Sequence, residues 1–214
     1  MVRYSFGTRL TRLSDEEGRN RAGTCITVMT LEEFRETKEL YLHRKVMVHS
    51  MENIHYCKAE AYGGCTMGTF MIPNKKDLLG EKFSFGFYVT DTELILLDEG
   101  DMMTDILRWM EDIASKEGAG HGHTGEETGK EKETAAAPAG FLILLMDYLI
   151  RNDVLFLQKY EEKLEDMEDE LLDHQPKNFY ETVIVSRKEL LALHTYYEQL
   201  ISLGFDDIHV KLQG

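Results

Sequence analysis

The chain has 214 residues, of which 43% are apolar, and a formal net charge of −15. This length suits one generous domain or a domain with an appendage, and the apolar content is enough for a sizeable core. The negative charge excludes a broad phosphate-binding surface, so nucleic acid is not expected as a partner. It instead favours a high local concentration of cations around the protein.

The cysteines, Cys25, Cys57 and Cys65, are odd in number and include no CxxC pair. This pattern indicates reduced and mostly buried thiols, which suits a cytosolic protein. The N-terminal residues contain arginines where a signal peptide has an apolar run. The longest uncharged window, residues 61–74, is too short to cross a membrane.

Residues 1–117 are predicted to form a mixed α/β subdomain. The β-branched stretch TCITVMT, residues 24–30, favours a strand. Thr30 then precedes the helical pattern LEEFRETKELYLH, residues 31–43, and Glu33 lies three residues after Thr30. This spacing is that of a capping box, so a helix is predicted to begin directly after Thr30.

Two hairpins and a further helix are predicted in the rest of this subdomain. The runs IHYCKAEAY and CTMGTFMI flank Gly63-Gly64, a pair typical of a tight turn between antiparallel strands. FSFGFYV alternates, with Phe83, Phe85 and Phe87 on one face, and returns through a turn into ELILLD. The segment MTDILRWMEDIASK has apolar residues at helical spacing.

Residues 118–137 differ in composition from their surroundings. The stretch from Gly118 to Gly140 contains no Leu, Ile, Val, Phe, Met, Tyr or Trp, so it is predicted to be a flexible surface loop. Its HGH pair, His121 and His123, has no third ligand nearby in the sequence and no rigid frame. This favours exposed histidines over a metal site.

Residues 138–204 are predicted to form a long antiparallel helical hairpin. Pro138 suits the first turn of a helix, and a single long helix is expected from there to Pro176. Apolar residues recur from Leu157 at alternating steps of three and four, which is a heptad seam. Gly204 is expected to end the second helix. The residues expected between the two helices are Leu157, Tyr160, Leu164, Met167 and Leu171 on the first and Phe179, Val183, Leu190, Leu193, Tyr197 and Leu200 on the second.

The predicted fold class is therefore α/β (α+β), with a mixed β-sheet flanked by helices and followed by the hairpin. Residues 205–214 show no packing pattern of their own. They are expected to be a tail that leads to a stalk helix beyond this chain.

The segment from Arg151 to Asp173 is strongly acidic, with nine Asp or Glu residues against three Lys or Arg residues. Such a stretch is usually the solvated face of a helix, where lysines relieve the repulsion between neighbouring carboxylates. The alternative is a face for hard cations such as Mg²⁺, which take oxygen ligands and often keep their waters. The candidate metal-binding residues, in a loose mode without a specific cage, are Glu165, Asp166, Glu168 and Asp169.

No motif for catalysis or for cofactor binding occurs in the chain. GxGxxG, GxxxxGK[ST], HExxH and GxSxG are all absent. The eight histidines are scattered, and His49 and His55 have no nucleophile at an interpretable spacing. The sequence therefore predicts neither an enzyme nor a bound cofactor, and it indicates no catalytic residue.

Three stretches occur in an informative order. The α/β part contains KAEAYGGCTMGTFMIPNKKDLLGEKFSFGFYVTDTELILLDEG, which is followed by FLILLMDYLIRNDVLFLQKYEEKLEDMEDELLD and then by RKELLALHTYYEQLISL. This order resembles the cytoplasmic part of CorA-type divalent-cation (magnesium) transporters. Leu145 to Phe156 is similar to the family's leucine-rich LxYLLxDxLVDxYF run, and Glu161 to Leu172 is similar to its acidic EExLExxExELL continuation. The resemblance covers essentially the whole chain.

The resemblance implies that the chain is the soluble cytoplasmic regulatory domain of a CorA-like transporter in an inner or plasma membrane. Mg²⁺ would be both the transported ion and the regulatory ion. Expected partners are divalent cations and further copies of the chain, because the family forms pentamers. The rival interpretation is a stand-alone soluble module for protein interaction or ligand binding.

Other family features are expected to follow the end of this chain. They are the stalk helix, the two membrane helices and the Gly-Met-Asn pore signature, and contact with the membrane is expected only through them. The family also places cation-sensing carboxylates at subunit interfaces. The position aligned with one of these, just before MENIHY, reads His49-Ser50 and has no aspartate.

Overall fold

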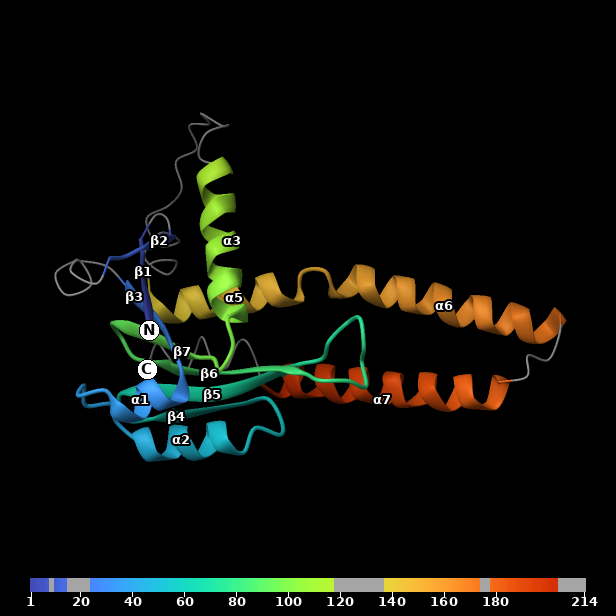
Figure 1. The fold of residues 1–214 in the computed structure, drawn as a ribbon, viewed down its shortest axis with the longest axis horizontal. Coiled ribbons are helices and arrows are strands. Elements are labelled where there is room, and N and C mark those ends of the chain that lie inside the picture. Colours follow the sequence, from blue (N-terminus) through green and yellow to red (C-terminus); the bar gives the residue numbers. More distant parts are fainter. Residues whose placement is uncertain (8–9, 15–23, 118–136, 174–177, 204–214) are drawn as a thin grey trace.

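The structure, a computed structural model, describes residues 1–7, 10–14, 24–117, 137–173 and 178–203. The strands are β1 (Val2–Phe6), β2 (Leu10–Arg12), β3 (Thr24–Met29), β4 (Lys58–Tyr62), β5 (Cys65–Ile72), β6 (Phe83–Val89) and β7 (Glu93–Leu97). The helices are α1 (Leu31–Glu36), α2 (Arg44–Glu52), α3 (Met102–Glu117), α5 (Pro138–Ile150), α6 (Asp153–Asp173) and α7 (Phe179–Leu203). The predicted fold class is confirmed: a mixed sheet is flanked by helices, and a long helical hairpin follows it (Figure 1).

The seven strands form one sheet in the order β2-β1-β3-β7-β6-β5-β4. Every neighbouring pair is antiparallel except the central β3–β7 pair, which is parallel. Parallel neighbours need a long connection, and here it runs through α1, α2 and the antiparallel β4-β5-β6 strands. The predicted turn at Gly63-Gly64 joins β4 to β5, and Gly64 has a φ of +87°, which a residue with a side chain rarely adopts.

The predicted helix after Thr30 begins where expected but is shorter than the predicted range of 31–43. The capping box is present, since the Glu33 amide donates to Thr30 Oγ1 at 3.2 Å and the Thr30 amide donates to Glu33 Oε2 at 2.9 Å. Helix α1 nevertheless ends at Glu36. The Arg44 guanidinium holds the following loop instead, because it donates to backbone carbonyls, among them that of Thr37 at 3.0 Å.

Helices cover both faces of the sheet. Helices α1 and α2 lie on one face, and α3, α5 and the end of α7 lie on the other (Figure 1). The predicted alternation in β6 is confirmed, because Phe85 and Phe87 face the α3/α5/α7 side whereas Tyr88 belongs to the core under α2. Gly86 lets α2 approach, since a Cβ there would lie 2.3 Å from the sulfur of Met51.

The single helix expected from Pro138 to Pro176 is a wrong prediction, because the structure divides it into α5 and α6. Helix α5 ends at Ile150, and α6 begins at Asp153 (Figure 1). The Asn152 carbonyl accepts the Phe156 amide at 3.0 Å, so a new helix begins there. Asn and Asp favour helix starts over helix interiors, which explains the interruption.

Several predictions fall on residues outside those described. They concern nearly all of the loop 118–137 with His121 and His123, the helix ends at Pro176 and Gly204, and the tail 205–214. The described cysteines carry free thiols, and Cys57 and Cys65 are buried as predicted. Among the described helices, none combines the length and the apolar character that a membrane span requires.

Candidate functional site

The hairpin of α6 and α7 extends away from the sheet, and its two helices run antiparallel (Figure 1). Tyr160 is the main polar link between them. Its hydroxyl donates to Glu189 Oε2 at 2.8 Å and lies 3.3 Å from the Ser186 carbonyl oxygen. Burial and the neighbouring Glu189 carboxylate raise the pKa of Tyr160 to about 12. Lys163 also contacts Glu189, at 3.1 Å, so the two helices are joined by a small charged network.

The apolar contact between the two helices is thin. Leu164 is partly buried and packs against a small cluster formed by Leu78, Tyr160 and Leu193. Three other predicted seam positions, Leu157, Val183 and Leu190, are exposed, so the predicted seam is only partly buried. The hairpin therefore leaves part of its predicted apolar seam in contact with water.

The predicted cation-binding residues lie together on the outer surface of α6. Glu165, Asp166, Glu168 and Asp169 are all exposed, and within the described residues none of them forms an ion pair. Residues three and four apart are neighbours on a helix, so Glu165 lies beside both Glu168 and Asp169. The carboxylates therefore form an acidic strip that faces solvent.

This acidic strip is not a preformed cage. Within the part of the chain that the structure describes, no group of three or more His, Cys, Asp or Glu side chains converges to hold a metal ion. A fully hydrated cation held through its own waters does not need such a group. Cation binding at Glu165, Asp166, Glu168 and Asp169 stays a prediction.

An ion pair with a buried carboxylate joins the hairpin to the segment that follows β5. Asp153, at the start of α6, is only 5% exposed. It pairs with Lys75 Nζ from the segment after β5 and accepts a hydrogen bond from the Tyr197 hydroxyl of α7 at 2.9 Å. Burial, and then the hydrogen bond to Asp153, raise the pKa of Tyr197. Three elements therefore meet at one carboxylate, which makes this junction the mechanical link between sheet and hairpin.

Sequence reasoning did not identify this junction. In the sequence, Asp153 is only one of the nine acidic residues between Arg151 and Asp173. Its partners are distant in the sequence, with Lys75 separated from it by 78 positions. The available signal was local: an Asn-Asp pair inside an otherwise apolar run indicates a helix start.

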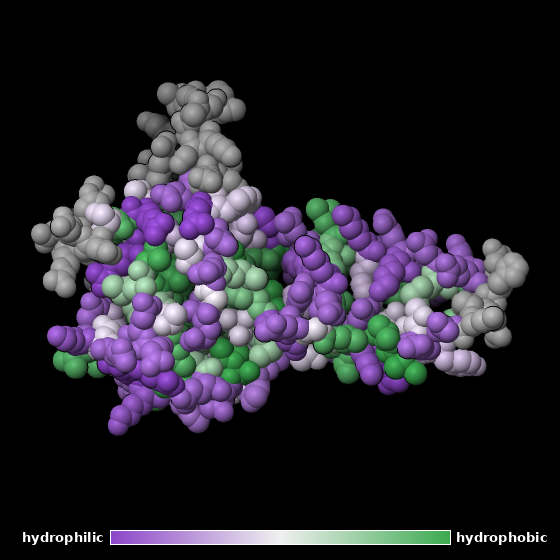
Figure 2. Space-filling view, in the orientation of Figure 1, coloured by the Kyte–Doolittle hydropathy of each residue, from purple (hydrophilic) through white to green (hydrophobic). Residues whose placement is uncertain are grey.

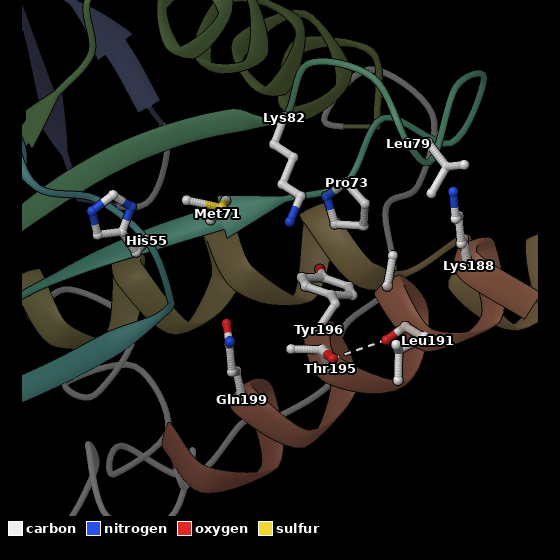
Figure 3. A pocket seen from close by; sticks show the side chains of 11 residues that line it. His55, Met71, Pro73, Leu79, Lys82, Lys188, Leu191, Thr195, Tyr196 and Gln199 are labelled. Carbon is white, nitrogen blue, oxygen red and sulfur yellow. Dashed lines mark hydrogen bonds between the residues drawn. The ribbon is translucent and has the colours of Figure 1, made fainter.

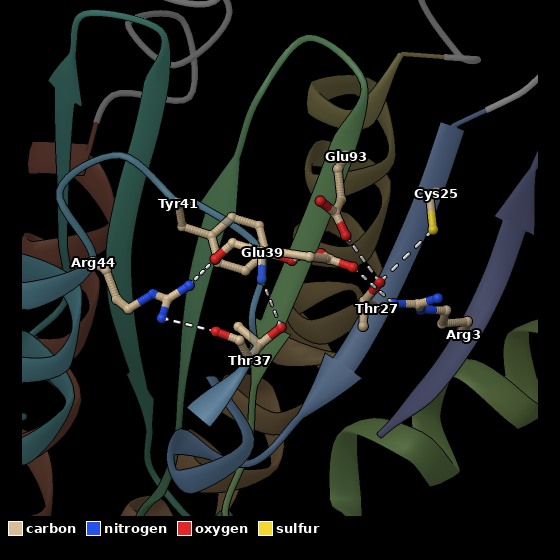
Figure 4. A network of polar contacts seen from close by, with 8 residues as sticks. All are labelled: Arg3, Cys25, Thr27, Thr37, Glu39, Tyr41, Arg44 and Glu93. Carbon is tan, nitrogen blue, oxygen red and sulfur yellow. Dashed lines mark hydrogen bonds and ion pairs between the residues drawn. The ribbon is translucent and has the colours of Figure 1, made fainter. Parts of the chain in front are cut away.

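A second polar cluster lies where β3 and β7 begin (Figure 4). Glu93 of β7 accepts a hydrogen bond from the Thr27 hydroxyl at 3.2 Å, and Glu39 forms an ion pair with Arg3 at 3.3 Å. Burial, and then the charge of Glu39, raise the pKa of Glu93. Arg3 pairs with Glu39 and its charge favours the ionised form of Glu93, so both carboxylates have partners within this cluster.

The position aligned with a family sensing carboxylate lies in α2. His49 is exposed there, and Ser50 is buried. Neither side chain can supply an anionic oxygen ligand. Any cation sensing by this chain must therefore use carboxylates elsewhere on its surface.

Comparison with known proteins finds similarity in structure only. No protein-family model and no curated protein sequence matches the chain. The full-length CmaX protein is similar with a TM-score of 0.66 at 12% identity, over 100% of this chain and 68% of that one. The CorA magnesium transporter from Methanocaldococcus jannaschii is similar with a TM-score of 0.60 at 12% identity, over 99% of this chain and 69% of that one. The ZntB cytoplasmic domain from Vibrio parahaemolyticus is similar with a TM-score of 0.61 at 12% identity, over 100% of this chain and 87% of that one.

These similarities extend across the α/β part and the hairpin together. At such low identity they concern the arrangement of the backbone and not the chemistry of individual residues. The resemblance noted in the sequence is thus supported at the level of the fold. The chain has the fold of the corresponding parts of the CmaX, CorA and ZntB structures.

Proposed function

We propose that this chain is the cytoplasmic regulatory domain of a CorA-like divalent-cation transporter. The observation that carries the proposal is the extent of the match, since 99% of the chain aligns with 69% of a CorA magnesium transporter. A fold alone does not fix a function. The acidic strip on α6 supports the proposal, because cation sensing needs anionic oxygen ligands.

The proposed mechanism is a shift between assembled and loosened states. Mg²⁺ bridging the acidic strips of neighbouring subunits would favour a closed, symmetric assembly. Loss of the ion would leave like charges facing each other, and the assembly would loosen. The Asp153–Lys75–Tyr197 junction would carry movement of the hairpin to the sheet, because all three elements meet there. The transported ion in this proposal is Mg²⁺, and the pore lies outside these residues.

Self-association is part of the proposal, and exposed apolar side chains on the hairpin support it. Figure 2 shows hydrophobic residues on the surface at the start of α6 and along α7. They include Val154 and Leu155 of α6, with exposed fractions of 66% and 58%, and Ile184 and Leu191 of α7, with 55% and 63%. Exposed apolar surface of this kind marks protein contacts. The same surface would also serve the rival function, a stand-alone interaction module.

Sedimentation velocity at constant ionic strength tests the regulatory part of the proposal. MgCl₂ at about 10 mM, balanced with NaCl, is expected to raise the sedimentation coefficient of the chain. The variant Glu165→Gln/Asp166→Asn/Glu168→Gln/Asp169→Asn should not respond. A matched control removes four exposed acids from the α/β part, Glu32→Gln/Glu36→Gln/Glu81→Gln/Asp91→Asn, and should respond like the original chain. An equal response of both variants contradicts a role for the acidic strip.

The coding sequence that follows Gly214 separates the proposal from its rival. Two apolar segments of about 20 residues encoded there would support a transporter. Their absence from the complete reading frame would favour the stand-alone module.

A further inference from the structure

A pocket lies between the sheet and helix α7 of the hairpin. It has a volume of about 390 Å³ and is lined by His55 from the segment before β4, by the end of β5, by the segment that leads into β6, and by α7 (Figure 3). This volume falls in the range of pockets that hold small organic molecules. The pocket is separate from the acidic strip of α6, which contributes none of its lining residues.

The polar lining of this pocket has the opposite charge to the rest of the protein. Lys82, Lys188 and His55 line it, and no Asp or Glu does. The whole chain has 39 Asp and Glu residues against 24 Lys and Arg residues, so a lining with lysines and without carboxylates departs from its composition. Neither lysine forms an ion pair with a described residue. The pocket therefore offers two uncompensated ammonium groups.

The hydroxyl of a largely buried tyrosine reaches the same pocket. Tyr196 is only 5% exposed, yet its hydroxyl makes no hydrogen bond within the described residues. Figure 3 shows this hydroxyl on the side of the pocket where Lys82 lies. Burial, and then the charge of Asp153, raise the pKa of Tyr196, so the group stays protonated and remains a donor. An acceptor in the pocket would give this hydroxyl a hydrogen-bond partner in place of water.

Two further polar side chains, Gln199 and Thr195, line the pocket. The Gln199 side-chain oxygen accepts the Cys57 amide at 3.0 Å, and its NH₂ group is left without a partner among the described residues. The Thr195 hydroxyl is already used, because it donates to the Leu191 carbonyl at 2.9 Å (Figure 3). Donors thus predominate among the free polar groups of the pocket. Such a set matches an anion better than a cation.

The remaining lining is apolar. Met71, Pro73, Leu79 and Leu191 contribute hydrocarbon surface around the donors. An inorganic anion would leave this surface in contact with water, whereas a molecule with an apolar body would cover it. We propose that the pocket binds a small organic anion, in which one carboxylate or phosphate group is attached to an apolar body of about one ring.

Binding there would tie the hairpin to the sheet. Lys82 precedes β6 and Lys188 belongs to α7, so a ligand that contacts both lysines would connect the two parts. A ligand that prefers one arrangement of these parts shifts the population toward it. Ligand binding in this pocket would thus add regulation by a small organic anion to the proposed regulation by a cation. The pocket assignment does not depend on the proposed transporter function.

Isothermal titration calorimetry of the 214-residue chain at constant ionic strength tests the assignment. The probes are benzoate and phenyl phosphate, with benzyl alcohol as a neutral analogue and inorganic phosphate as an anion without an apolar body. At least one organic anion is expected to bind saturably with a Kd of about 1 mM or below, and both comparison compounds at least about tenfold more weakly. Binding of benzyl alcohol or inorganic phosphate with equal affinity overturns the proposed ligand class.

Variants locate the binding. Lys82→Gln/Lys188→Gln should weaken binding of the organic anion about tenfold or more, because charge-assisted hydrogen bonds are lost. Tyr196→Phe should weaken it about threefold to tenfold while keeping the packed ring. The control Lys45→Gln/Lys159→Gln removes two exposed lysines far from the lining and should bind as the original chain does. Unchanged affinity in the first variant, or no saturable binding below about 10 mM in the original chain, overturns the proposal.

Discussion

At the scale of single residues, Asp153 lies at the boundary between two helices, α5 and α6. Its position inside an apolar run interrupts the helix, and its burial next to Lys75 and Tyr197 fixes the place where α6 begins. A buried charge is tolerated only when it is paired and hydrogen-bonded, and both conditions are met here. The sequence marks the interruption, but only the folded chain supplies the partners.

The variant Asp153→Asn is expected to destabilise the protein by about 1–3 kcal/mol, because Lys75 loses its buried partner while Tyr197 keeps an acceptor. Urea unfolding measures the change. The matched control is Asp105→Asn, which breaks the exposed Asp105–Arg108 pair at 3.1 Å. This control should cost less than about 0.5 kcal/mol, since exposed ion pairs contribute little. Equal costs at the two positions would mean that the junction is solvated.

Glu93 provides a pH-dependent test. Burial and the charge of Glu39 raise its pKa in the folded state, so the folded protein binds a proton more tightly at Glu93 than the unfolded chain does. Its contribution to stability therefore falls as pH rises from the unfolded pKa through the raised folded pKa. Glu93→Gln is expected to remove this fall and to stabilise the protein at pH 7. The gain should not exceed about 1 kcal/mol, because Glu93 is partly exposed and its charge is screened.

The measurement is urea unfolding of the original chain and of Glu93→Gln at several values between about pH 4 and pH 8. The difference in unfolding free energy should grow with pH and then level off. The exposed Glu81→Gln serves as the control and should give a nearly constant difference. A Glu93→Gln variant that is less stable at neutral pH would show that Arg3 favours the charged form more than burial opposes it.

At the scale of elements, local signals predicted what local contacts decide. The Thr30–Glu33 capping box, the Gly63-Gly64 turn and the alternation of β6 each depend on residues a few positions apart, and each is present. The early end of α1 depends on Arg44, which holds the loop carbonyls after the helix has ended. The sequence of α1 itself therefore gives no sign of the contact with Arg44.

Pairings between distant segments could not be predicted in the same way. The short strands β1 and β2 are strands only because β3 pairs with β1, and the parallel β3–β7 pair joins segments that are far apart in the chain. The same distinction between local and distant contacts applies to the candidate functional sites. The acidic strip on α6 follows from helical spacing alone, whereas the Asp153–Lys75 junction and the pocket between Lys82 and Lys188 require the tertiary fold.

The hairpin seam gives a prediction that compares two adjacent positions of α6. Leu164 is partly buried against the cluster that contains Tyr160, whereas Glu165 is exposed. Leu164→Asp should destabilise the protein by about 2–4 kcal/mol, because it places an unpaired charge in an apolar contact. Glu165→Gln should change stability by less than about 0.5 kcal/mol. Thermal or urea unfolding distinguishes them, and similar effects would mean that the helix is rotated relative to this description.

At the scale of the whole molecule, a net charge of −15 sets the background for every cation effect. Any salt stabilises such a chain by screening its self-repulsion. Specific Mg²⁺ binding is therefore recognised as the stabilisation that MgCl₂ gives beyond that given by NaCl at the same ionic strength. The exposed and unpaired carboxylates of the α6 strip are the place where that part should arise.

Mg²⁺ is expected to bind the α6 strip weakly, with a Kd in the millimolar range, because no cage of three or more ligands converges among the described residues. At ten times its Kd, a ligand that binds only the folded state adds about 1.4 kcal/mol of stability. For a chain of this size that corresponds to a rise in Tm of about 3–5 °C. The rise should saturate with MgCl₂ concentration when NaCl keeps the ionic strength constant.

Neutralising Glu165, Asp166, Glu168 and Asp169 to their amides should remove most of this rise. It should also raise the Tm measured without Mg²⁺, because neighbouring carboxylates on one helix face repel each other. The α/β control variant at Glu32, Glu36, Glu81 and Asp91 removes the same charge elsewhere and should keep the saturable response. If NaCl at matched ionic strength stabilises the chain as well as MgCl₂ does, or if the strip variant responds like the original, then Tyr160 to Asp173 is only the solvated face of a helix.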